Sequence, residues 1–318
     1  MRIPTLPKVS IIVPVYNGAS TLASCIESLL NQTYPSNLTE IIIIDNNSID
    51  GSDMIIESYP VQLLYERDIQ TSYAARNKGI NEAAGDILAF TDSDCVVSPD
   101  WIDHIVPHFL DPEVGGVIGP ILNYESNSLI GKFSKSHNPI KHSKNKGLIA
   151  AVTANVAYRS ALIDKLGCFD ELLFTAGDVD LSYRFQIIEN KKFVYENNAV
   201  VHHKTRESLY GLFQQYTRYG YSEILLATLY RHRENNHNNK KQLSIKIRNQ
   251  IFALLIYSLS FLKRIILQPF KKYSQLDLYK PALLFIIELA TIIGKIKALI
   301  DTRFMNKNPY PSREEIIR

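Results

Sequence analysis

Short apolar runs alternate with amphipathic segments along the first two thirds of the chain. Each run holds four to eight residues and is mostly apolar, as expected for strands that are covered on both faces. The segments between the runs place apolar residues three and four positions apart, which is typical of helices with one buried side. Strand and helix in alternation indicate a mostly parallel, three-layer α/β sheet. The pattern predicts strands at residues 9–13, 41–44, 61–65, 87–91 and 114–121, and helices at residues 19–31, 53–58, 73–84 and 99–110.

The pattern becomes irregular after the fifth predicted strand. Residues 123–146 are polar and rich in lysine without a clear period, so we expect a long loop of the kind that often carries function. Regular patterning then returns in shorter pieces. It predicts helices at residues 160–166 and 179–189, short strands at residues 193–194 and 200–201, and a helical run from about residue 209.

Two strongly apolar segments lie near the C-terminus, at residues 251–262 and 282–293, after a polar and basic segment at residues 231–250. Neither contains the uninterrupted run of ~20 apolar residues that spans a bilayer. Their basic flanks favour helices that lie in a membrane interface, with Lys and Arg side chains at the lipid headgroups. A soluble helical hairpin and a true membrane span are the alternatives. The flanking residues are Lys263, Arg264, Lys271, Lys272, Lys280, Lys295 and Lys297.

Composition and charge narrow the class of protein. Hydrophobic residues make up 46% and charged residues 21% of the 318 residues, which excludes a disordered chain, a collagen and a disulfide miniprotein. The three cysteines form no CxxC pair, so we expect reduced thiols and no zinc site. The first apolar run is too short and too interrupted by proline for a signal peptide, so we expect the N-terminal part to lie in the cytoplasm.

The two ends of the chain differ in charge. Residues 1–200 carry 15 Lys and Arg against 24 Asp and Glu, whereas residues 201–318 carry 20 against 8. The acidic part is suited to holding a metal ion, and the basic part to facing anionic lipid or simply solvent. We expect no nucleic-acid partner, because no helix-turn-helix, zinc or RNA-binding motif accompanies the basic segment.

Polar side chains follow three of the predicted strands. Asp92 and Asp94 come directly after the strand at residues 87–91, and two carboxylates this close together favour a hard divalent cation, Mg²⁺ or Mn²⁺. Asp45 follows the strand at residues 41–44, and Tyr16 follows the first strand. Since open α/β sheets bind ligands at the carboxyl ends of their strands, these groups predict one metal and phosphate site, with Arg76 available to pair with phosphates. Ordinary packing of Tyr16 and helix capping by Asp45 are the alternatives.

The combination of VSIIVPVYNG, IIIIDNNSIDGS, AARNKG, FTDSDC, LGCFDE and GDVDLSYR resembles the family 2 glycosyltransferases, over roughly residues 8–220. The resemblance implies the GT-A fold, a three-layer sandwich that binds a nucleotide-sugar, followed here by a helical C-terminal region. It implies that Arg76 lies near the base and diphosphate, that Asp92 contacts the ribose or the metal shell, and that Asp94 binds the metal. The residues implied to line the base pocket are Pro14, Tyr16, Asn17 and Asp45.

The resemblance also implies a general base. Family members usually show an acidic pair before xDLxxR, and here Gly177 replaces the first acid while Asp178 keeps the second position, that of the base. The alternative for Asp178 is the N-cap of the helix at residues 179–189. Asp180 and Arg184 are four residues apart, which predicts a structural pair on a helix surface.

A histidine completes the implied set. Val201-His202-His203 resembles the VxH segment of the family, so His203 is expected at the metal or diphosphate, with His202 as the alternative one residue earlier. An ordinary surface histidine is the other interpretation.

The implied activity is inverting transfer of a sugar from a nucleotide-diphosphate sugar, UDP first, to a hydroxyl of a glycan or lipid-linked acceptor in cell-envelope polysaccharide or glycoconjugate synthesis. The alternatives are an inactive nucleotide-sugar-binding relative and a sugar nucleotidyltransferase, which would need a Gly-rich loop where this chain has PVYNG. We expect a catalytic domain at residues 1–220, with its nucleotide part at about 8–121 and its acceptor part at about 148–220, and a basic helical region at residues 221–318. The expected location is the cytoplasmic face of a membrane, with peripheral attachment.

Overall fold

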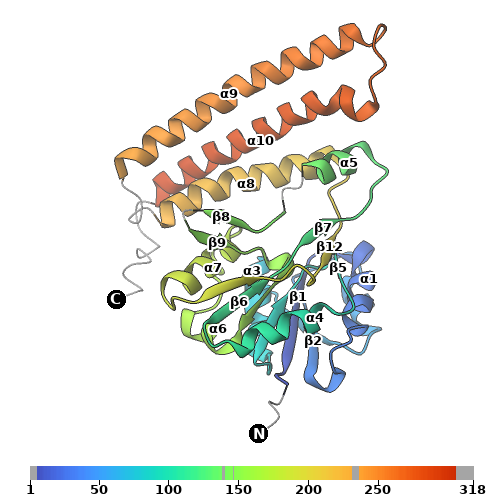
Figure 1. The fold of residues 1–318 in the computed structure, drawn as a ribbon, viewed down its shortest axis with the longest axis vertical. Coiled ribbons are helices and arrows are strands. Elements are labelled where there is room, and N and C mark those ends of the chain that lie inside the picture. Colours follow the sequence, from blue (N-terminus) through green and yellow to red (C-terminus); the bar gives the residue numbers. More distant parts are fainter. Residues whose placement is uncertain (1–5, 138–139, 146, 231–235, 306–318) are drawn as a thin grey trace. The chain divides into compact units, whose positions relative to one another are not determined.

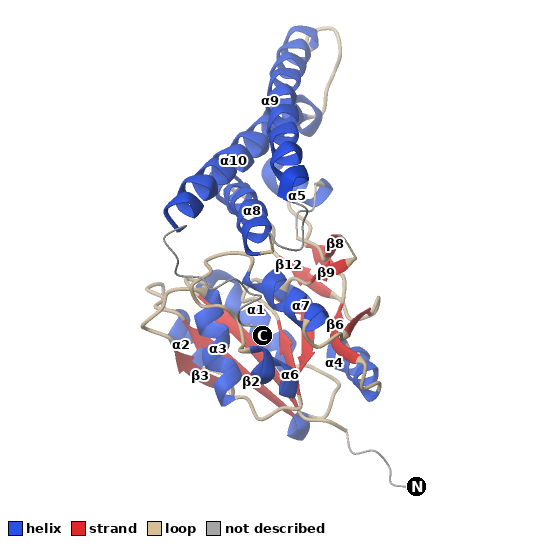
Figure 2. Cartoon of the chain, turned by 90° about the vertical axis from the view of Figure 1, so that its left-hand side faces the viewer, coloured by secondary structure: helices blue, strands red, loops and turns tan. Residues whose placement is uncertain are grey.

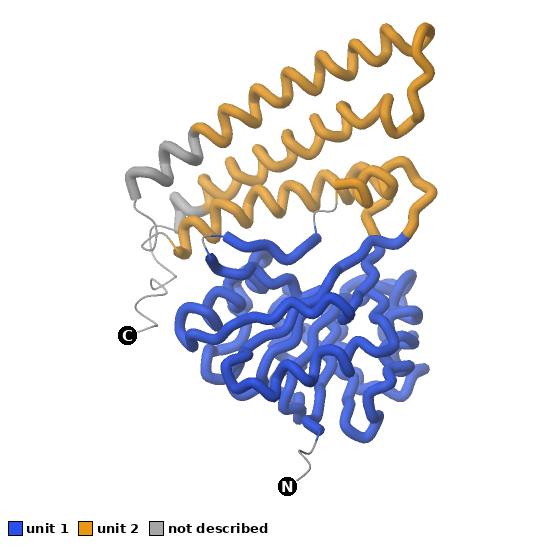
Figure 3. The backbone as a smooth tube through the Cα atoms, viewed as in Figure 1, with its two compact units in different colours: residues 1–124, 139–204 blue, residues 125–138, 205–318 orange. Residues whose placement is uncertain are grey.

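The computed structural model describes residues 6–137, 140–145, 147–230 and 236–305, and the side chains of residues 236–244 and 302–305 are outside that description. The chain forms two compact units, which Figure 3 colours separately. The first unit contains residues 1–124 and 139–204, and the second contains residues 125–138 and 205–318. By their contacts, residues 205–220 belong to the second unit. The end of the catalytic domain expected at residue 220 stays a prediction.

A seven-stranded sheet forms the centre of the first unit (Figure 1). Of its six pairs of neighbouring strands, four are parallel, and the two that involve β10 are antiparallel. The predicted α/β class with a mostly parallel sheet is confirmed. The order is β11 (Lys192–Tyr195), β6 (Val114–Ile118), β10 (Val156–Arg159), β4 (Ile87–Phe90), β1 (Val9–Val15), β2 (Thr39–Asp45) and β3 (Gln62–Tyr65).

The sequence suggested that the first strand ends before Pro14, but the strand continues through this residue. β1 continues to Val15, and Pro14 pairs in register with Ile44 of β2. On its other side β1 pairs with β4 only as far as Ile12, so Pro14 lies beyond the part of the strand that is paired on both edges. A residue without an N–H is tolerated where one edge of the strand has no partner.

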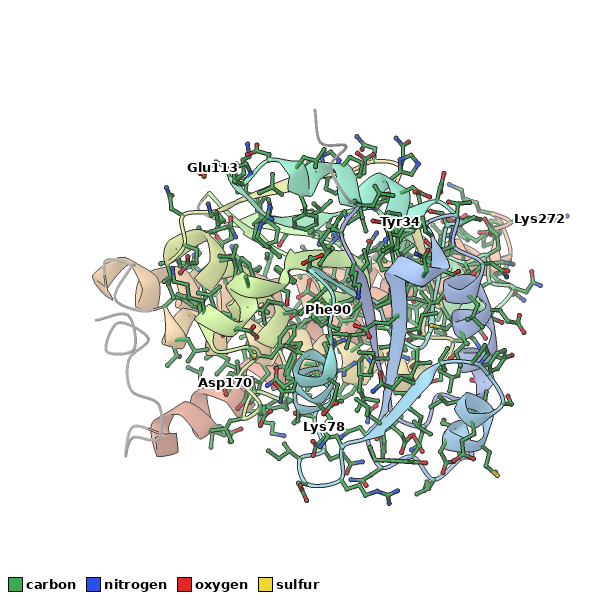
Figure 4. The ribbon with its side chains drawn as sticks, turned by 90° about the horizontal axis from the view of Figure 1, so that it is seen from below. Tyr34, Lys78, Phe90, Glu113, Asp170 and Lys272 are labelled. Carbon is green, nitrogen blue, oxygen red and sulfur yellow. The ribbon has the colours of Figure 1, made fainter. Side chains whose placement is uncertain are left out.

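Helices cover both faces of this sheet. On one face, alternate residues of β1 pack against α1 (Ala19–Leu30), α2 (Ser52–Glu57) and α4 (Trp101–Ile105), which a short 3-10 helix continues (Val106–Leu110). On the other face lie α3 (Ser72–Glu82), α6 (Ser160–Leu166) and α7 (Gly177–Ile187). Figure 2 shows these helices around the red strands, and in Figure 4 Phe90, the fully buried last residue of β4, is labelled in the interior. The helices predicted at residues 19–31, 53–58, 73–84, 160–166 and 179–189 are confirmed to within two residues at most ends.

A second, three-stranded sheet was not predicted. The apolar run at residues 114–121 breaks after Ile118, and β7 (Ile121–Asn123) leaves the main sheet to pair with β12 (Val201–His203). β12 also pairs, antiparallel, with β5 (Cys95–Val97), which directly follows the Asp92–Asp94 segment. This small sheet therefore joins three distant parts of the chain beside the carboxyl end of β4.

The region expected to be one long loop contains regular structure. α5 (Leu129–Ser136) begins with a Ser128 side chain that accepts a hydrogen bond from the Gly131 N–H, an ordinary N-cap. β8 (Ser143–Asn145) pairs with β9 (Leu148–Ala150) in a two-stranded sheet. The prediction of an irregular segment was wrong here because the polar face of a short amphipathic helix hides its period. Lys146 lies outside the described residues.

The second unit is helical. It contains α5, α8 (Leu209–Leu229), α9 (Asn236–Leu267) and α10 (Gln275–Met305), and a small apolar cluster joins Phe133 of α5 to Leu212 of α8 and Leu283 of α10. α8 and α10 approach closely because Gly220 faces the Thr291 carbonyl and Gly294 faces the Thr217 carbonyl, where a side chain would not fit. Residues 231–235 of the expected polar segment lie outside the described residues.

Lys295 is not available to lipid headgroups, in contrast to the role expected for it. Its side chain is 3% exposed and its Nζ lies 2.8 Å from Glu223 Oε2 and 2.9 Å from Gln250 Oε1. Gln250 in turn donates to Glu288 Oε2 at 2.8 Å. The lysine can be buried because Glu223 on α8 and Gln250 on α9 satisfy its ammonium group.

The outer side of α9 is apolar and exposed. Residues 245–267 form one helical segment that is long and apolar enough, by length and composition, to cross a membrane, with a mean hydropathy of 1.6 and none of its residues buried. The exposed side chains follow one another at intervals of three and four residues, so they share one face of the helix. We call this set the α9 stripe: Phe252, Leu255, Leu259, Leu262 and Ile266.

Candidate active site

The base-binding end of the expected site lies at the carboxyl ends of β1 and β2. Asp45 is 4% exposed; its Oδ2 accepts a hydrogen bond from the Ser48 N–H at 3.2 Å, and its buried Oδ1 has no hydrogen-bond partner within the described chain. A buried, unpaired acceptor carries a free-energy penalty that a ligand N–H would remove. Tyr16 is 55% exposed at the same edge, so its ring is open to stacking.

Asn17, which is expected to line the base pocket, lies in the loop after β1. Its backbone has a positive φ of 51°, its Oδ1 accepts from the Ile49 N–H at 2.9 Å, and its own N–H donates to Ser48 Oγ at 2.9 Å. Asn tolerates this left-handed conformation better than most residues. Asn17 therefore holds the loop after β2 against the loop after β1, close in sequence to Pro14.

Arg76 and Asp92 form a close ion pair. Arg76 Nη2 lies 2.5 Å from Asp92 Oδ1, and the arginine is 3% exposed, on α3, whereas Asp92 follows β4. The guanidinium also lies 5.8 Å from the centre of the Tyr73 ring and 6.0 Å from that of Phe169. Its Nε is buried without a partner among the described residues. Arg76 thus offsets the charge of Asp92 and keeps a free N–H donor for an anionic ligand.

The small sheet brings His203 to Asp94. In the antiparallel pairing of β12 with β5, His203 stands opposite Cys95, and the Lys204 N–H donates to the Asp94 carbonyl at 2.9 Å. His203 Nε2 lies 3.4 Å from Asp94 Oδ2, and the ring is 3% exposed. His202 stands opposite Val96 and lies beside the Tyr124 ring, with centroids 5.5 Å apart. The strand register therefore places His203, and not its neighbour, at the aspartate.

These donors fit a hard divalent cation. Asp92, Asp94 and Cys95 offer ligand atoms that all lie within 4.8 Å of one another. Burial raises the pKa of the Cys95 thiol well above its ordinary value, with the carboxylates of Asp92 and Asp94 adding to the shift. A cysteine sulfur is also a poor ligand for Mg²⁺ and Mn²⁺, which prefer oxygen. Two carboxylates and an imidazole are the donor set that remains, and Mg²⁺ and Mn²⁺ accept such oxygen-rich sets.

Asp178 lies in the first turn of α7 and does not cap it. The helix begins at Gly177, its N-cap is Ala176 with a φ of 63°, and no side chain caps it. Asp178 Oδ1 accepts from the Val179 N–H at 3.0 Å. Burial raises the pKa of Asp178 above its ordinary value, and the nearby Arg76 guanidinium works against that shift. The N-cap interpretation of Asp178 was wrong.

Contacts connect Asp178 to the aspartate after β4. Tyr73 Oη lies 3.5 Å from Asp178 Oδ1, the Arg76 guanidinium lies over the Tyr73 ring, and Arg76 pairs with Asp92. Sequence reasoning had not singled out Tyr73. A signal was available, because Tyr73 and Arg76 are three residues apart on α3 and so share a face of the helix.

Asp180 and Arg184 form a buried pair, and the expectation of a surface pair was wrong. Arg184 Nε lies 3.0 Å from Asp180 Oδ2, with side chains 6% and 0% exposed. The two Nη groups donate to the Leu166 and Cys168 carbonyls at 2.5 Å each. Arg184 therefore fixes the end of α6 to α7, which carries Asp178.

The chain that forms this site is similar to known proteins in sequence and in fold. The sequence model described as glycosyl transferase family 2 matches residues 10–167, which contain Asp45, Arg76 and the Asp92–Asp94 segment. The chain belongs to this family. Asp178 and His203 lie beyond the matched residues.

Three relatives illustrate the similarity. Glycosyltransferase AglE of Haloferax volcanii is 34% identical over 57% of this chain and 62% of its own length. The pre-mycofactocin glycosyltransferase of Mycobacterium tuberculosis is 26% identical over 70% of this chain and 48% of its own length. The chain thus spans between about half and less than two thirds of these relatives. An uncharacterized glycosyltransferase of Rickettsia typhi is 30% identical over 60% of this chain.

A solved structure shares the fold over most of the chain. The mannosyltransferase PcManGT from Pyrobaculum calidifontis, in complex with GDP-Man and Mn²⁺, superposes with a TM-score of 0.59 and covers 94% of this chain and 88% of its own, at 19% identity. The GT-A architecture expected for the family 2 chain is confirmed by this likeness.

Proposed function

We propose that this protein is an inverting glycosyltransferase that moves a sugar from a nucleotide-diphosphate sugar to an acceptor hydroxyl. The observation that carries the proposal is the connected series Asp92, Arg76, Tyr73 and Asp178, which joins a strand-end acid pair to a second carboxylate on α7. The acid pair can hold a cation at the donor diphosphate, and the carboxylate on α7 can take the proton of an acceptor hydroxyl. Family membership supports the same reaction class.

In this mechanism the protein binds the donor at three points. Asp45 Oδ1 accepts an N–H of the base, Tyr16 stacks on it, and the Arg76 Nε–H faces the diphosphate. A divalent cation held by Asp94 and His203, next to Asp92, would offset the charge that develops on the leaving diphosphate.

The acceptor oxygen attacks the anomeric carbon as the bond from that carbon to the diphosphate oxygen breaks, and the diphosphate leaves with the electron pair. Asp178 takes the proton of the acceptor hydroxyl as the new bond forms. Attack from the face opposite the leaving group inverts the anomeric centre. Asp178 needs to be ionised for this step, and Arg76 favours its charged form against the effect of burial.

A donor screen tests the proposal. Purified protein would be heated with UDP-, GDP- and dTDP-sugars, with and without Mn²⁺, and sugar transfer or donor hydrolysis would be followed in parallel. We expect UDP-sugars to stabilise the protein first, with GDP-mannose as the alternative. A ligand at 100 times its Kd should raise the melting temperature by roughly 5 °C. Stabilisation by a donor without turnover on any acceptor would favour a binding-only relative.

Replacing Asp94 or His203 with alanine should remove the Mn²⁺-dependent part of this stabilisation. The matched control is His202→Ala, because His202 occupies the next position of the same strand but stands opposite Val96. We expect His202→Ala to keep the cation effect. Equal losses in the two histidine variants would argue against His203 as a cation ligand.

We also propose that the α9 stripe rests on the cytoplasmic face of a membrane, where a lipid-linked acceptor would be found. Five large apolar side chains between 57% and 69% exposed form a patch that a soluble monomer rarely leaves open. Exposed Arg248, Lys263, Lys271 and Lys272 flank it, and their charge complements anionic lipids. A helix with one apolar side and basic edges is suited to lying in the interface.

Vesicle binding tests this placement. Phe252→Glu with Leu259→Glu should weaken binding to phosphatidylglycerol-containing vesicles at least about tenfold, because each buried apolar side chain contributes ~1.5–3 kcal/mol. The control is Gln268→Glu, an exposed position directly after α9 that adds negative charge outside the stripe. If the protein does not bind vesicles and forms dimers through the stripe, the membrane proposal is wrong.

A further inference from the structure

Tyr73 fills the space that an acidic residue at position 177 would need. Its ring is 6% exposed and stacks on Phe169, with centroids 5.7 Å apart and planes 21° from parallel. A Cβ placed on Gly177 would lie 2.8–3.0 Å from three carbons of the Tyr73 ring. Real Cβ atoms essentially never approach ring carbons so closely, and stacking on Phe169 prevents the ring from moving away. The absence of a side chain at Gly177 and the presence of Tyr73 are therefore two parts of one packing arrangement.

The hydroxyl of Tyr73 is directed to Asp178. Its Oη lies 3.5 Å from Asp178 Oδ1, at the long end of hydrogen-bonding distances, and catalytic hydrogen bonds often tighten once substrate is bound. Burial raises the pKa of Tyr73 far above its ordinary value, and the Asp178 carboxylate raises it further, so the hydroxyl keeps its proton and is the donor in its contact with that carboxylate. The Val179 N–H reaches the same oxygen at 3.0 Å.

We propose that Tyr73 is a positioning residue for the base Asp178, and that Gly177 is the residue that makes room for it. The inference rests on the proposed function, because it takes Asp178 to be the base. The Tyr73 hydroxyl and the Val179 N–H hold Oδ1, and Oδ2 is then the oxygen that receives the proton of the acceptor. In this chain a buried phenol on α3 thus stands where the family usually places a second acid on α7.

Removing only the hydroxyl tests the role of Tyr73. Tyr73→Phe keeps the ring on Phe169 and should lower kcat about tenfold, which corresponds to one hydrogen bond to a charged group. A donor to the carboxylate favours its charged form, so the pKa of Asp178 should rise in Tyr73→Phe and the acid limb of kcat/KM should move to higher pH. The other groups that act on Asp178 are Arg76, Asp92 and Tyr158, and the variant leaves all three in place.

The control is Tyr59→Phe. Tyr59 Oη also contacts a carboxylate, Glu27 Oε1 at 3.0 Å, but on an exposed part of the chain away from the site. This variant should keep the wild-type kcat and pH profile. In Tyr73→Phe the melting-temperature gain on adding donor and Mn²⁺ should match the wild type, which shows that the donor site is intact. Unchanged kcat and an unchanged acid limb would overturn the proposal.

A titration of the Asp178 carboxyl by ¹³C NMR decides the same question without turnover. If the wild type transfers no sugar, the proposed function fails, yet the carboxyl titration still reports whether Tyr73 acts on Asp178. An equal pKa in the wild type and in Tyr73→Phe would overturn the inference by itself.

A double variant tests whether the Tyr73 ring and a side chain at position 177 compete for the same space. Gly177→Glu should lower the melting temperature sharply, because the new side chain meets the ring. Adding Tyr73→Ala to Gly177→Glu should recover part of that loss, although Tyr73→Ala alone is destabilising. Strictly additive losses would show that the two positions do not share space.

Discussion

Replacing Asp178 with asparagine is expected to lower kcat by about 10²–10⁴-fold, the usual contribution of a positioned base. Asparagine has the same shape but cannot accept the proton of the acceptor hydroxyl. Donor binding should be unaffected, because the residues expected to hold the nucleotide lie at the ends of β1, β2 and β4 and on α3, whereas Asp178 lies on α7. The measurements are initial rates at saturating donor and the melting-temperature gain with donor and Mn²⁺.

The pH profile adds a second signature. Because burial raises the pKa of Asp178, the ionised base is lost at a higher pH than for an exposed aspartate, and activity should fall from that higher pH downward. Asp170→Asn is a control near the same site, since Asp170 belongs to the loop before α7 and is not part of the connected series. An Asp178→Asn variant with most of its wild-type kcat would exclude Asp178 as the base.

Replacing Arg184 with alanine should lower the free energy of unfolding by about 3–5 kcal/mol, as for other buried ion pairs that lose one partner. The change leaves the Asp180 carboxylate charged at 0% side-chain exposure and removes the donors to the Leu166 and Cys168 carbonyls. Urea denaturation, monitored by tryptophan fluorescence, measures the loss; Trp101, the single tryptophan, is fully buried in the first unit.

The matched control is Lys165→Ala. Lys165 also pairs with an acid, Glu189, at 2.8 Å, but its side chain is 65% exposed. Such surface pairs contribute ~0–1 kcal/mol, so the control should stay close to the wild type. Similar losses for the two variants would mean that the Arg184 pair does not stabilise the fold as its burial requires.

The strand ends were predictable from the sequence because they follow strong local patterns. The apolar run before Asp45 and the run before Asp92 each specify a buried strand, and the polar residue after each run must then lie at the edge of the sheet. Asp178 was reached through the family motif, because a lone aspartate near the start of a helix is usually a cap.

The small sheet could not be predicted, although it positions His203. Each of its strands has three residues, too few to show a period, and their pairing joins parts of the chain that are distant in sequence. The choice between His202 and His203 depends on the register with β5, and a shift of one residue would turn the other histidine toward Asp94.

The burial of charged side chains could not be predicted from the sequence either. The spacing of Asp180 and Arg184 correctly implied contact, but contact between i and i+4 is equally compatible with the surface and the interior. Lys295 shows the same limit. Its position beside an apolar segment suggested a lipid-facing charge, whereas Glu223 and Gln250, from two other helices, provide the partners that allow it to be buried.

The small sheet also sets the order in which the site can form while the chain is being made. The ribosome delivers Asp45 and the Asp92–Asp94 pair early, and β12 only after about two thirds of the chain. Until then Asp92 can pair with Arg76, but Asp94 lacks the nearby His203 imidazole. The proposed cation site can therefore be complete only once synthesis has passed residue 203, later than every strand that carries the proposed nucleotide contacts.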